Sequence, residues 1–167
     1  RMQELLVALR HGGFVITPNV DHLMKLQRSR EFNDVYRSAD YRVCDSQILL
    51  FVSRFLGAPI VEKISGSDLF PAFYDYYCND ETMTIYLLGA GPGVAERAQL
   101  KINDKVGRRM VVGAHSPSFG FERDAAECDA IIERINASGA SVLAVGVGAP
   151  KQELWIAKHR HRLVNVK

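Results

Sequence analysis

Residues 13–23, Gly-Phe-Val-Ile-Thr-Pro-Asn-Val-Asp-His-Leu, decide the fold of this chain. The apolar run at 13–16 predicts a buried strand, and the Thr-Pro-Asn turn after it predicts the start of a helix. This turn places a hydroxyl, a carboxamide and free helix amides at the carboxyl end of a strand, which is the edge where ligands bind in open α/β sheets. We therefore expect Thr17 and Asn19 to line a ligand site.

Two later segments repeat this layout. Residues 87–93 read Leu-Leu-Gly-Ala-Gly-Pro-Gly, and residues 145–153 read Val-Gly-Val-Gly-Ala-Pro-Lys-Gln-Glu. Each passes from an apolar strand through a glycine-rich turn into a helix. Three such strand ends in one small chain predict a single pocket of the nucleotide-binding type.

Strands alternate with helices along the whole sequence. Helices are expected over residues 2–11, 19–29, 46–56, 68–79, 93–105, 122–137 and 150–161, and strands over 13–17, 41–44, 84–88, 109–113 and 141–146. Ser67 or Asp68 is the expected N-cap of the helix at 68–79. The alternation predicts the α/β class, with a Rossmann-like parallel sheet, right-handed connections and helices on both faces. The length of 167 residues fits a single domain over 1–167.

Composition excludes several classes of protein. The formal net charge of +2 is too small to indicate a nucleic-acid partner. The odd set Cys44, Cys78 and Cys128 has no paired spacing, which argues against disulfides and zinc and for a cytoplasmic protein. The basic cluster at 158–162 is either a solvated helix end or a contact with phosphate or an anionic membrane surface. No apolar run approaches the roughly 18 residues that span a bilayer, so any membrane contact is peripheral.

The glycine loop of residues 89–93 is not a dinucleotide fingerprint. Val94 stands where the third glycine is usual, and the acidic residue about 20 positions on is missing. Gly89, Gly91 and Gly93 therefore either contact a phosphate through the backbone or only form a tight turn. No Walker loop is present, and no Asp-x-Asp, His-x-x-x-His or Cys-x-x-Cys pair offers a ligand set for metal. We expect neither a metal nor a cofactor.

Asp45 stands where the short strand at 41–44 gives way to a helix. It is either an N-cap or a general base that takes the proton of an acceptor hydroxyl. Lys63 is either a surface residue or part of the site. Lys151 and Gln152 begin a helix after a glycine-rich turn and are expected to face the pocket. The irregular loop at 114–121 is expected to close over a nucleotide base with Phe119 or Phe121.

In this order, the motifs resemble those of the WecG/TagA/CpsF glycosyltransferase family. The matching blocks are Thr-Pro-Asn-Val-Asp-His-Leu (17–23), Cys-Asp-Ser (44–46), Lys-Ile-Ser-Gly-Ser-Asp-Leu (63–69), Leu-Leu-Gly-Ala-Gly-Pro-Gly-Val-Ala (87–95), Ser-Pro-Ser-Phe-Gly-Phe (116–121) and Val-Gly-Ala-Pro-Lys-Gln-Glu (147–153). The Thr-x-Asn and Pro-Lys-Gln-Glu blocks together are specific, whereas the glycine loop alone is not.

The resemblance implies an inverting, metal-independent transferase that moves an N-acetylmannosamine-type sugar from a UDP-sugar to a polyprenyl-pyrophosphate-linked saccharide. Such enzymes serve the synthesis of wall teichoic acid, capsule and common antigen at the inner membrane face. Asp45 matches the family's proposed general base. Thr17, Asn19 and Gln152 match positions expected to line the donor sugar and diphosphate. A homo-oligomer is also possible.

Three departures qualify the resemblance. Cys44 and Ser46 flank Asp45 where Ala and Gly are common, and Lys63 replaces a common Arg, which weakens any bidentate phosphate contact. The family also continues past Lys167 into a membrane-binding C-terminal appendage, so we expect a core domain without it. The alternatives are a catalytically incomplete module that binds a UDP-sugar and a Rossmann-like nucleotide-sugar hydrolase or epimerase.

Overall fold

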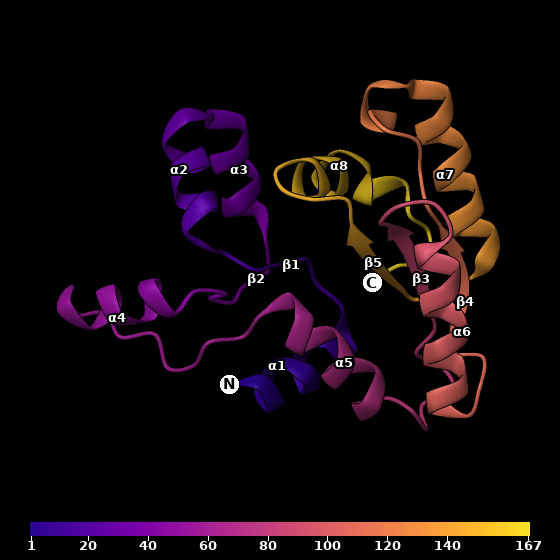
Figure 1. The fold of residues 1–167 in the computed structure, drawn as a ribbon, viewed down its shortest axis with the longest axis horizontal. Coiled ribbons are helices and arrows are strands. Elements are labelled where there is room, and N and C mark those ends of the chain that lie inside the picture. Colours follow the sequence, from indigo (N-terminus) through magenta and orange to yellow (C-terminus); the bar gives the residue numbers. More distant parts are fainter. The chain divides into compact units, whose positions relative to one another are not determined.

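Every strand pairing in the computed structural model, which describes residues 1–167, is parallel. The chain separates into two units, Arg1–Phe73 and Tyr74–Lys167 (Figure 1). Both units alternate strands with helices, so the predicted α/β, Rossmann-like class is confirmed. The prediction that residues 1–167 act as a single domain stays a prediction.

The first unit is built around a short parallel pair of strands. Its elements are α1 (Met2–Ala8), η1 (Leu9–His11), β1 (Val15–Ile16), α2 (Val20–Arg28), α3 (Arg30–Ser38), β2 (Tyr41–Arg42), α4 (Gln47–Phe55) and α5 (Gly66–Tyr76). Val15 pairs with Tyr41 and Ile16 with Arg42. Both strands are shorter than predicted, although the N–H groups of Val43 and Asp45 still donate to the carbonyls of Ile16 and Pro18 beyond their ends.

Helix α3 was not predicted from the sequence. Ser29 adopts an extended backbone (φ −129°, ψ 111°) that ends α2, and its hydroxyl accepts from the backbone N–H of Phe32 at 3.1 Å. A serine N-cap therefore divides what reads as one helix followed by a loop into two consecutive helices. The fully buried Phe32 then packs edge-on against the rings of His22 and Tyr36, and His22 Nδ1 hydrogen-bonds the Tyr36 hydroxyl. These contacts hold α3 against α2.

The second unit is a three-stranded parallel sheet. It contains β3 (Ile85–Gly89), α6 (Val94–Val106), β4 (Val111–His115), η2 (Phe121–Arg123), α7 (Ala125–Ser138), β5 (Val142–Gly146), α8 (Lys151–His159) and η3 (Arg160–Arg162). The strand order is β4-β3-β5, so the first strand lies in the middle. The chain therefore leaves β3 toward one edge and crosses back to the other, which creates a switch point between β3 and β5.

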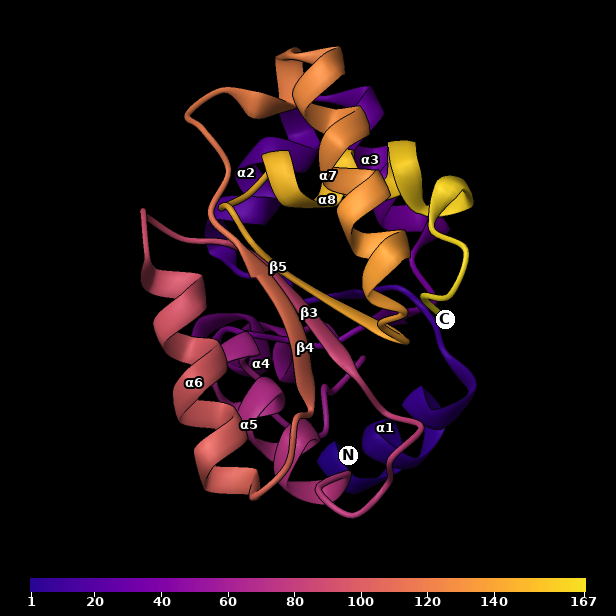
Figure 2. The same cartoon turned by 90° about the vertical axis from the view of Figure 1, so that its right-hand side faces the viewer.

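Helices cover both faces of this sheet, as Figure 2 shows. On one face the buried Tyr86 and Leu88 of β3 pack with residues of α7 and α8, including Ile131 and Trp155. Helix α6 lies on the other face (Figure 2), where Asn103 exchanges two hydrogen bonds with the backbone of Val111, at 2.7 and 3.0 Å. The central strand β3 is buried along its whole length, as expected for a parallel sheet covered by helices, whereas β4 and β5 are mostly half-buried.

Several predicted boundaries in the second unit were wrong. Strand β4 spans Val111–His115 rather than 109–113, and Arg108, just before it, donates to the carbonyls of Tyr77, Cys78, Asp80 and Met83. Helix α7 begins at Ala125 rather than 122, because Asp124 caps it by accepting from the N–H groups of Ala126 and Glu127. No helix in the structure is long and apolar enough to cross a membrane.

Candidate functional site

In the first unit, three chain segments meet at the strand ends. The N–H of Asp45 donates to the carbonyl of Pro18 at 2.7 Å, and the N–H of Ile64 donates to the carbonyl of Cys44 at 2.8 Å. The segments around Thr17, Asp45 and Ser65 are therefore adjacent. Residues that lie far apart in the sequence come together here, as the strand-end argument predicts.

Asp45 does not cap α4. Ser46 is the N-cap, and its hydroxyl accepts from the N–H of Leu49 at 3.3 Å. The Asp45 side chain is half-buried, and no residue of its own unit gives the carboxylate a hydrogen bond or an ion pair. The interpretation of Asp45 as an N-cap is wrong, because the neighbouring serine takes that role and leaves the carboxylate unused.

Asn19 and Thr17 keep polar groups at the same edge. Asn19 is the N-cap of α2, and its Oδ1 accepts from the N–H of His22 at 3.0 Å. The Thr17 side chain faces the start of α5, since its Oγ1 lies 3.8 Å from where a Cβ on Gly66 would be. The Asn19 carbonyl oxygen is occupied by capping, so its amide nitrogen is the group that remains for a ligand.

Helix α5 begins at Gly66, two residues earlier than predicted. Ser65 takes the capping role expected of Ser67 or Asp68: its buried hydroxyl accepts from the N–H of Asp68 at 3.1 Å and donates to the Asp68 carboxylate at 2.5 Å. Lys63 is exposed. It stands next to Ile64, whose backbone pairs with Cys44, so it lies one residue from the three-segment edge.

In the second unit, the glycine loop begins at Gly89, where β3 lies in close contact with β5. Gly89 has φ +138°, and a Cβ there would lie 2.4 Å from the carbonyl oxygen of Gly146. The next N–H, of Ala90, donates to the same carbonyl at 2.9 Å. Only glycine fits this position, and the loop thus opens directly over the switch point.

Beyond Gly89 the loop is open. A Cβ on Gly91 would meet no atom within 4 Å, and Gly93 is the left-handed N-cap of α6 (φ 73°). The guanidinium of Arg97 lies 3.1 Å from where a Cβ on Gly93 would be. A helix N-terminus with an arginine beside it favours an anionic ligand.

Ser116 fixes this loop from the end of β4. Its hydroxyl lies 3.2 Å from the carbonyl oxygen of Gly89 and 2.9 Å from that of Gly91. Ser116 was not predicted as a site residue, although it opens the Ser-Pro-Ser block. Its position shortly after the end of a predicted strand could have indicated that its hydroxyl lies at the ligand-binding edge of the sheet.

The turn before α8 is held by the side chains that follow it. Gln152 Oε1 accepts from the N–H of Gly148 at 3.1 Å, and Gln152 Nε2 donates to Glu153 Oε1 at 2.8 Å. Glu153 is buried, and its Oε2 has no hydrogen-bond partner. Gln152 therefore stands at the strand-end edge of its unit with its orientation set by Glu153.

The loop between β4 and α7 presents one aromatic ring and buries another. Phe119 is 99% exposed, and Lys151 Nζ lies 5.1 Å from its ring centroid. Phe121 is buried against Trp155, with ring centroids 6.1 Å apart, so it belongs to the core and not to a ligand site. The N–H and hydroxyl of Ser118 both donate to the Glu127 carboxylate, which anchors the loop and lowers the pKa of Glu127.

His115 ends β4 beside a cation. Its Nδ1 lies 3.3 Å from a guanidinium nitrogen of Arg134, and burial together with the Arg134 charge lowers the pKa of the imidazole. Burial raises the pKa of Tyr86 on the neighbouring strand. Both side chains are therefore neutral at pH 7, and Arg134 is the positive charge at this end of β4.

The predicted site residues divide between the two units. Thr17, Asn19, Asp45 and Lys63 belong to the first, and Gly89, Gly91, Gly93 and Gln152 to the second. Within each unit they lie at strand ends, as expected. The single pocket and the roles of these residues stay predictions. No group of three or more His, Cys, Asp or Glu side chains gathers where it could hold a metal ion.

The fold and the strand-end loops define an α/β protein of the Rossmann-like type, with polar and glycine-rich loops at the carboxyl ends of parallel strands. Comparison with known sequences identifies it further. The whole chain, residues 1–167, matches the glycosyl transferase WecG/TagA/CpsF family, and the protein belongs to that family.

One relative illustrates the match. The N-acetylglucosaminyldiphosphoundecaprenol N-acetyl-beta-D-mannosaminyltransferase of Bacillus spizizenii is 28% identical over 150 residues. The aligned part is 90% of this chain and 56% of that enzyme, so the chain spans little more than half the length of this relative.

Proposed function

We propose that this chain belongs to a glycosyltransferase that moves an N-acetylmannosamine-type sugar from a UDP-sugar to a polyprenyl-pyrophosphate-linked saccharide during synthesis of bacterial surface polysaccharide. Two findings support the proposal: the family match over residues 1–167 and the name of the similar enzyme from Bacillus spizizenii. The observation that carries it is the half-buried Asp45 carboxylate, which has no partner in its unit. Such an enzyme works at the cytoplasmic membrane as a peripheral protein.

The second unit is assigned to the donor. The amides at the start of α6, the guanidinium of Arg97 and the ammonium of Lys151 offer positive charge to a diphosphate at the switch point. The exposed ring of Phe119 is available to stack on the uracil. These groups supply charge stabilisation to the departing UDP without a metal ion.

Asp45 of the first unit is assigned to the acceptor. Asp45 takes the proton of the acceptor hydroxyl while its oxygen forms the new bond to the anomeric carbon. The bond from that carbon to the diphosphate breaks in the same step, UDP leaves with the electron pair, and the configuration inverts. Thr17 and Asn19, at the same strand end, offer a hydroxyl and an amide to the donor sugar under attack, and Lys63 offers an ammonium to a phosphate of the acceptor.

The proposal is tested by calorimetric titration of the chain with UDP and a panel of UDP-sugars, with and without a chelator. We expect micromolar binding that the chelator leaves unchanged, with the N-acetylmannosamine donor strongest. Binding abolished by the chelator would refute the metal-free reaction. A transfer assay on the same samples decides the remaining alternative, because UDP binding without any transfer identifies a catalytically incomplete binding module.

A further inference from the structure

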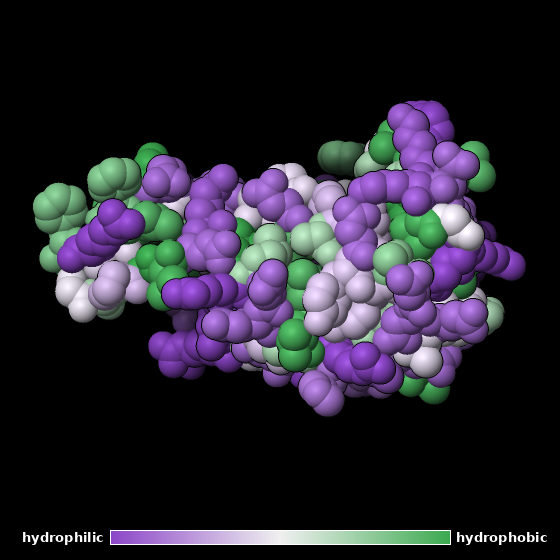
Figure 3. Space-filling view, turned by 90° about the horizontal axis from the view of Figure 1, so that it is seen from below, coloured by the Kyte–Doolittle hydropathy of each residue, from purple (hydrophilic) through white to green (hydrophobic).

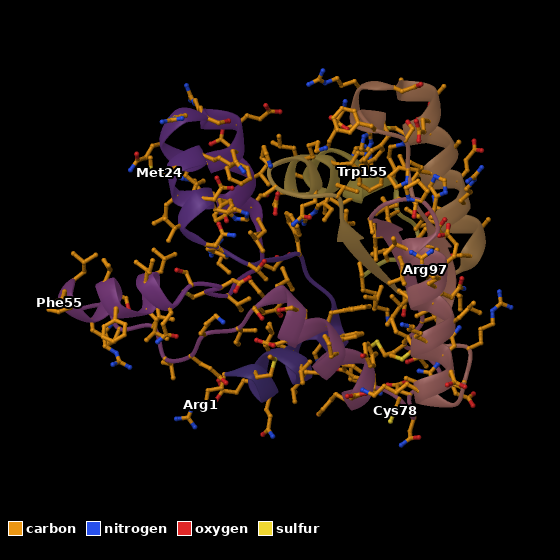
Figure 4. All side chains as sticks on the ribbon, viewed as in Figure 1. Arg1, Met24, Phe55, Cys78, Arg97 and Trp155 are labelled. Atoms are coloured by element: carbon orange, nitrogen blue, oxygen red, sulfur yellow. The ribbon has the colours of Figure 1, made fainter.

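Helix α4 presents an apolar face to solvent. Ile48, Phe51, Val52, Phe55 and Leu56 are all exposed, with Phe55 at 88% and Leu56 at 76%. Figure 3 shows hydrophobic side chains gathered at the end of the first unit where α4 lies, and Figure 4 shows Phe55 at the tip of that helix. Contiguous exposed apolar surface on a folded protein marks a site of interaction.

The orientation of α4 is fixed by its opposite face. Leu50 and Ser53 are buried, and the Ser53 hydroxyl donates to the carbonyl of Leu50 at 2.7 Å and accepts from the N–H of Ile60 at 3.0 Å. The serine faces the protein while the two phenylalanines face outward. This is the reverse of the usual surface helix, whose apolar side faces the core.

The charges around this face favour an anionic partner. Residues 47–63 contain two cations, Arg54 and Lys63, and a single acid, Glu62, whose carboxylate accepts from the backbone N–H of Met2 at 2.9 Å. The Arg54 guanidinium lies 5.9 Å from the Phe51 ring centroid. An arginine beside exposed aromatic and aliphatic side chains is the pattern of helices that lie in a membrane interface, where the cation stays at the headgroups.

The position of α4 in the chain connects this face to the chemistry. The helix begins at Gln47, two residues after Asp45. At 1.5 Å per residue, its nine residues extend only about 14 Å from that strand end. A polyprenyl-linked acceptor cannot leave the bilayer, so the residue that activates it must be held near the membrane surface.

We infer that the exposed face of α4, together with Val61, docks on the surface of an anionic lipid bilayer and brings Asp45 to the headgroups of the polyprenyl-linked acceptor. The inference rests on the proposed function, because the acceptor is the reason for choosing a lipid as the partner. Ile48, Phe51, Phe55 and Leu56 insert among the acyl chains, and Arg54 contacts lipid phosphates.

Vesicle flotation tests the inference. The chain is mixed with phosphatidylcholine vesicles with and without phosphatidylglycerol, and compared with the double variant Ile48→Glu/Phe55→Glu. We expect the wild type to float with the anionic vesicles and the variant to partition at least about tenfold more weakly, because it loses apolar surface and adds carboxylates. Leu100→Glu, which alters an equally exposed leucine on α6, is the matched control and should float like the wild type.

Three results would overturn the inference: no flotation of the wild type, equal flotation of the double variant, or lipid-free self-association that the double variant abolishes, which would assign the face to a second copy. If the double variant does not fold by circular dichroism, Phe51→Ser/Leu56→Ser answers the same question.

Transfer to a short-chain, water-soluble acceptor separates this inference from the proposed function. The α4 variant should retain that transfer and lose transfer to acceptor in vesicles, whereas a wild type inactive toward both acceptors contradicts the proposed function alone.

Discussion

Gly89 is the residue of the glycine loop that no other residue can replace without a steric clash. Its backbone has φ +138°, and the carbonyl of Gly146 on the neighbouring strand leaves no room for a Cβ. Gly91, two residues later, has open space around it. The same short loop thus contains one glycine required by packing and one that is free to serve a ligand.

We expect Gly89→Ala to lower the free energy of unfolding by about 3 kcal/mol or more, because the methyl group forces β3 and β5 apart and the backbone conformation is strained. Gly91→Ala is the matched control, with an expected change within about 0.5 kcal/mol. Urea unfolding followed by circular dichroism measures both. Equal losses for the two variants would show that the close contact does not determine stability.

Asp45 has a carboxylate that is free to act as a base. Because Ser46 caps α4, the carboxylate is not consumed by the helix, and it is only half exposed. Asp34, in the same unit, is exposed on the surface of α3. The two aspartates therefore offer a direct comparison between a proposed base and a solvated carboxylate.

Asp45→Asn should lower the rate of sugar transfer at least about a hundredfold, because the amide cannot accept the acceptor proton. Asp34→Asn should leave the rate unchanged. Transfer is measured by UDP release with a water-soluble acceptor. Both variants are made in a protein whose wild-type form is active in this assay. Retained turnover in Asp45→Asn would remove this residue from the mechanism.

Helix α8 carries the basic cluster at its carboxyl end, and one member of that cluster is not a surface residue. His159 is buried against Trp155, with ring centroids 5.1 Å apart, and its Nε2 has no hydrogen-bond partner. Burial, followed by the charges of Lys158 and Arg162, lowers the pKa of His159. The reading of residues 158–162 as a uniformly solvated helix end is therefore wrong at this position.

A lowered histidine pKa makes stability depend on pH. The unfolded chain binds the His159 proton near the ordinary pKa of 6.5, whereas the folded chain binds it only at lower pH. Stability should be fully present above pH 6.5 and fall as the pH drops through the lowered pKa. His115, whose pKa is lowered by burial and by Arg134, adds to the same trend.

His159→Phe should reduce this loss of stability between neutral and mildly acidic pH, because the phenyl ring keeps the contact with Trp155 and cannot bind a proton. His161→Gln, at an exposed position, should leave the pH dependence unchanged. Urea midpoints measured across that pH range decide the matter. If the urea midpoint of His159→Phe changes with pH as steeply as that of the wild type, His159 does not contribute to the pH dependence of stability.

The ends of a helix or strand can be predicted when residues in the local sequence mark them. The strand-to-helix transitions at Thr17, Gly89 and Gly146 were predicted, because glycine, proline and an apolar run mark them locally. Helix α3 was missed and α5 was misplaced, because serine hydroxyls at Ser29 and Ser65 decide those boundaries. A serine reads equally well as a loop residue, and only its bond to the backbone N–H three residues later shows that it is a cap.

Local sequence patterns do not predict the order of the strands in the sheet. The sequence predicts that β3, β4 and β5 are parallel, but the order β4-β3-β5 depends on long-range pairing, such as Gly89 with Gly146. The division into two units was likewise not visible, since no linker composition marks residue 73. It places the proposed base in one unit and the glycine loop, Lys151 and Phe119 in the other.

This division predicts that donor binding and proton removal respond to different substitutions. Lys151→Ala and Phe119→Ala should each weaken UDP binding about tenfold, since one removes a charge from the helix start and the other a stacking surface. Asp45→Asn should leave UDP affinity within about threefold, because its carboxylate is assigned to the acceptor hydroxyl and not to the nucleotide. Val164→Ala, at an exposed position of the second unit, is the control for nonspecific effects and should bind UDP like the wild type. Calorimetric titration measures all four variants, and UDP affinity lost equally in Asp45→Asn and Lys151→Ala would mean that Asp45 also contributes to donor binding.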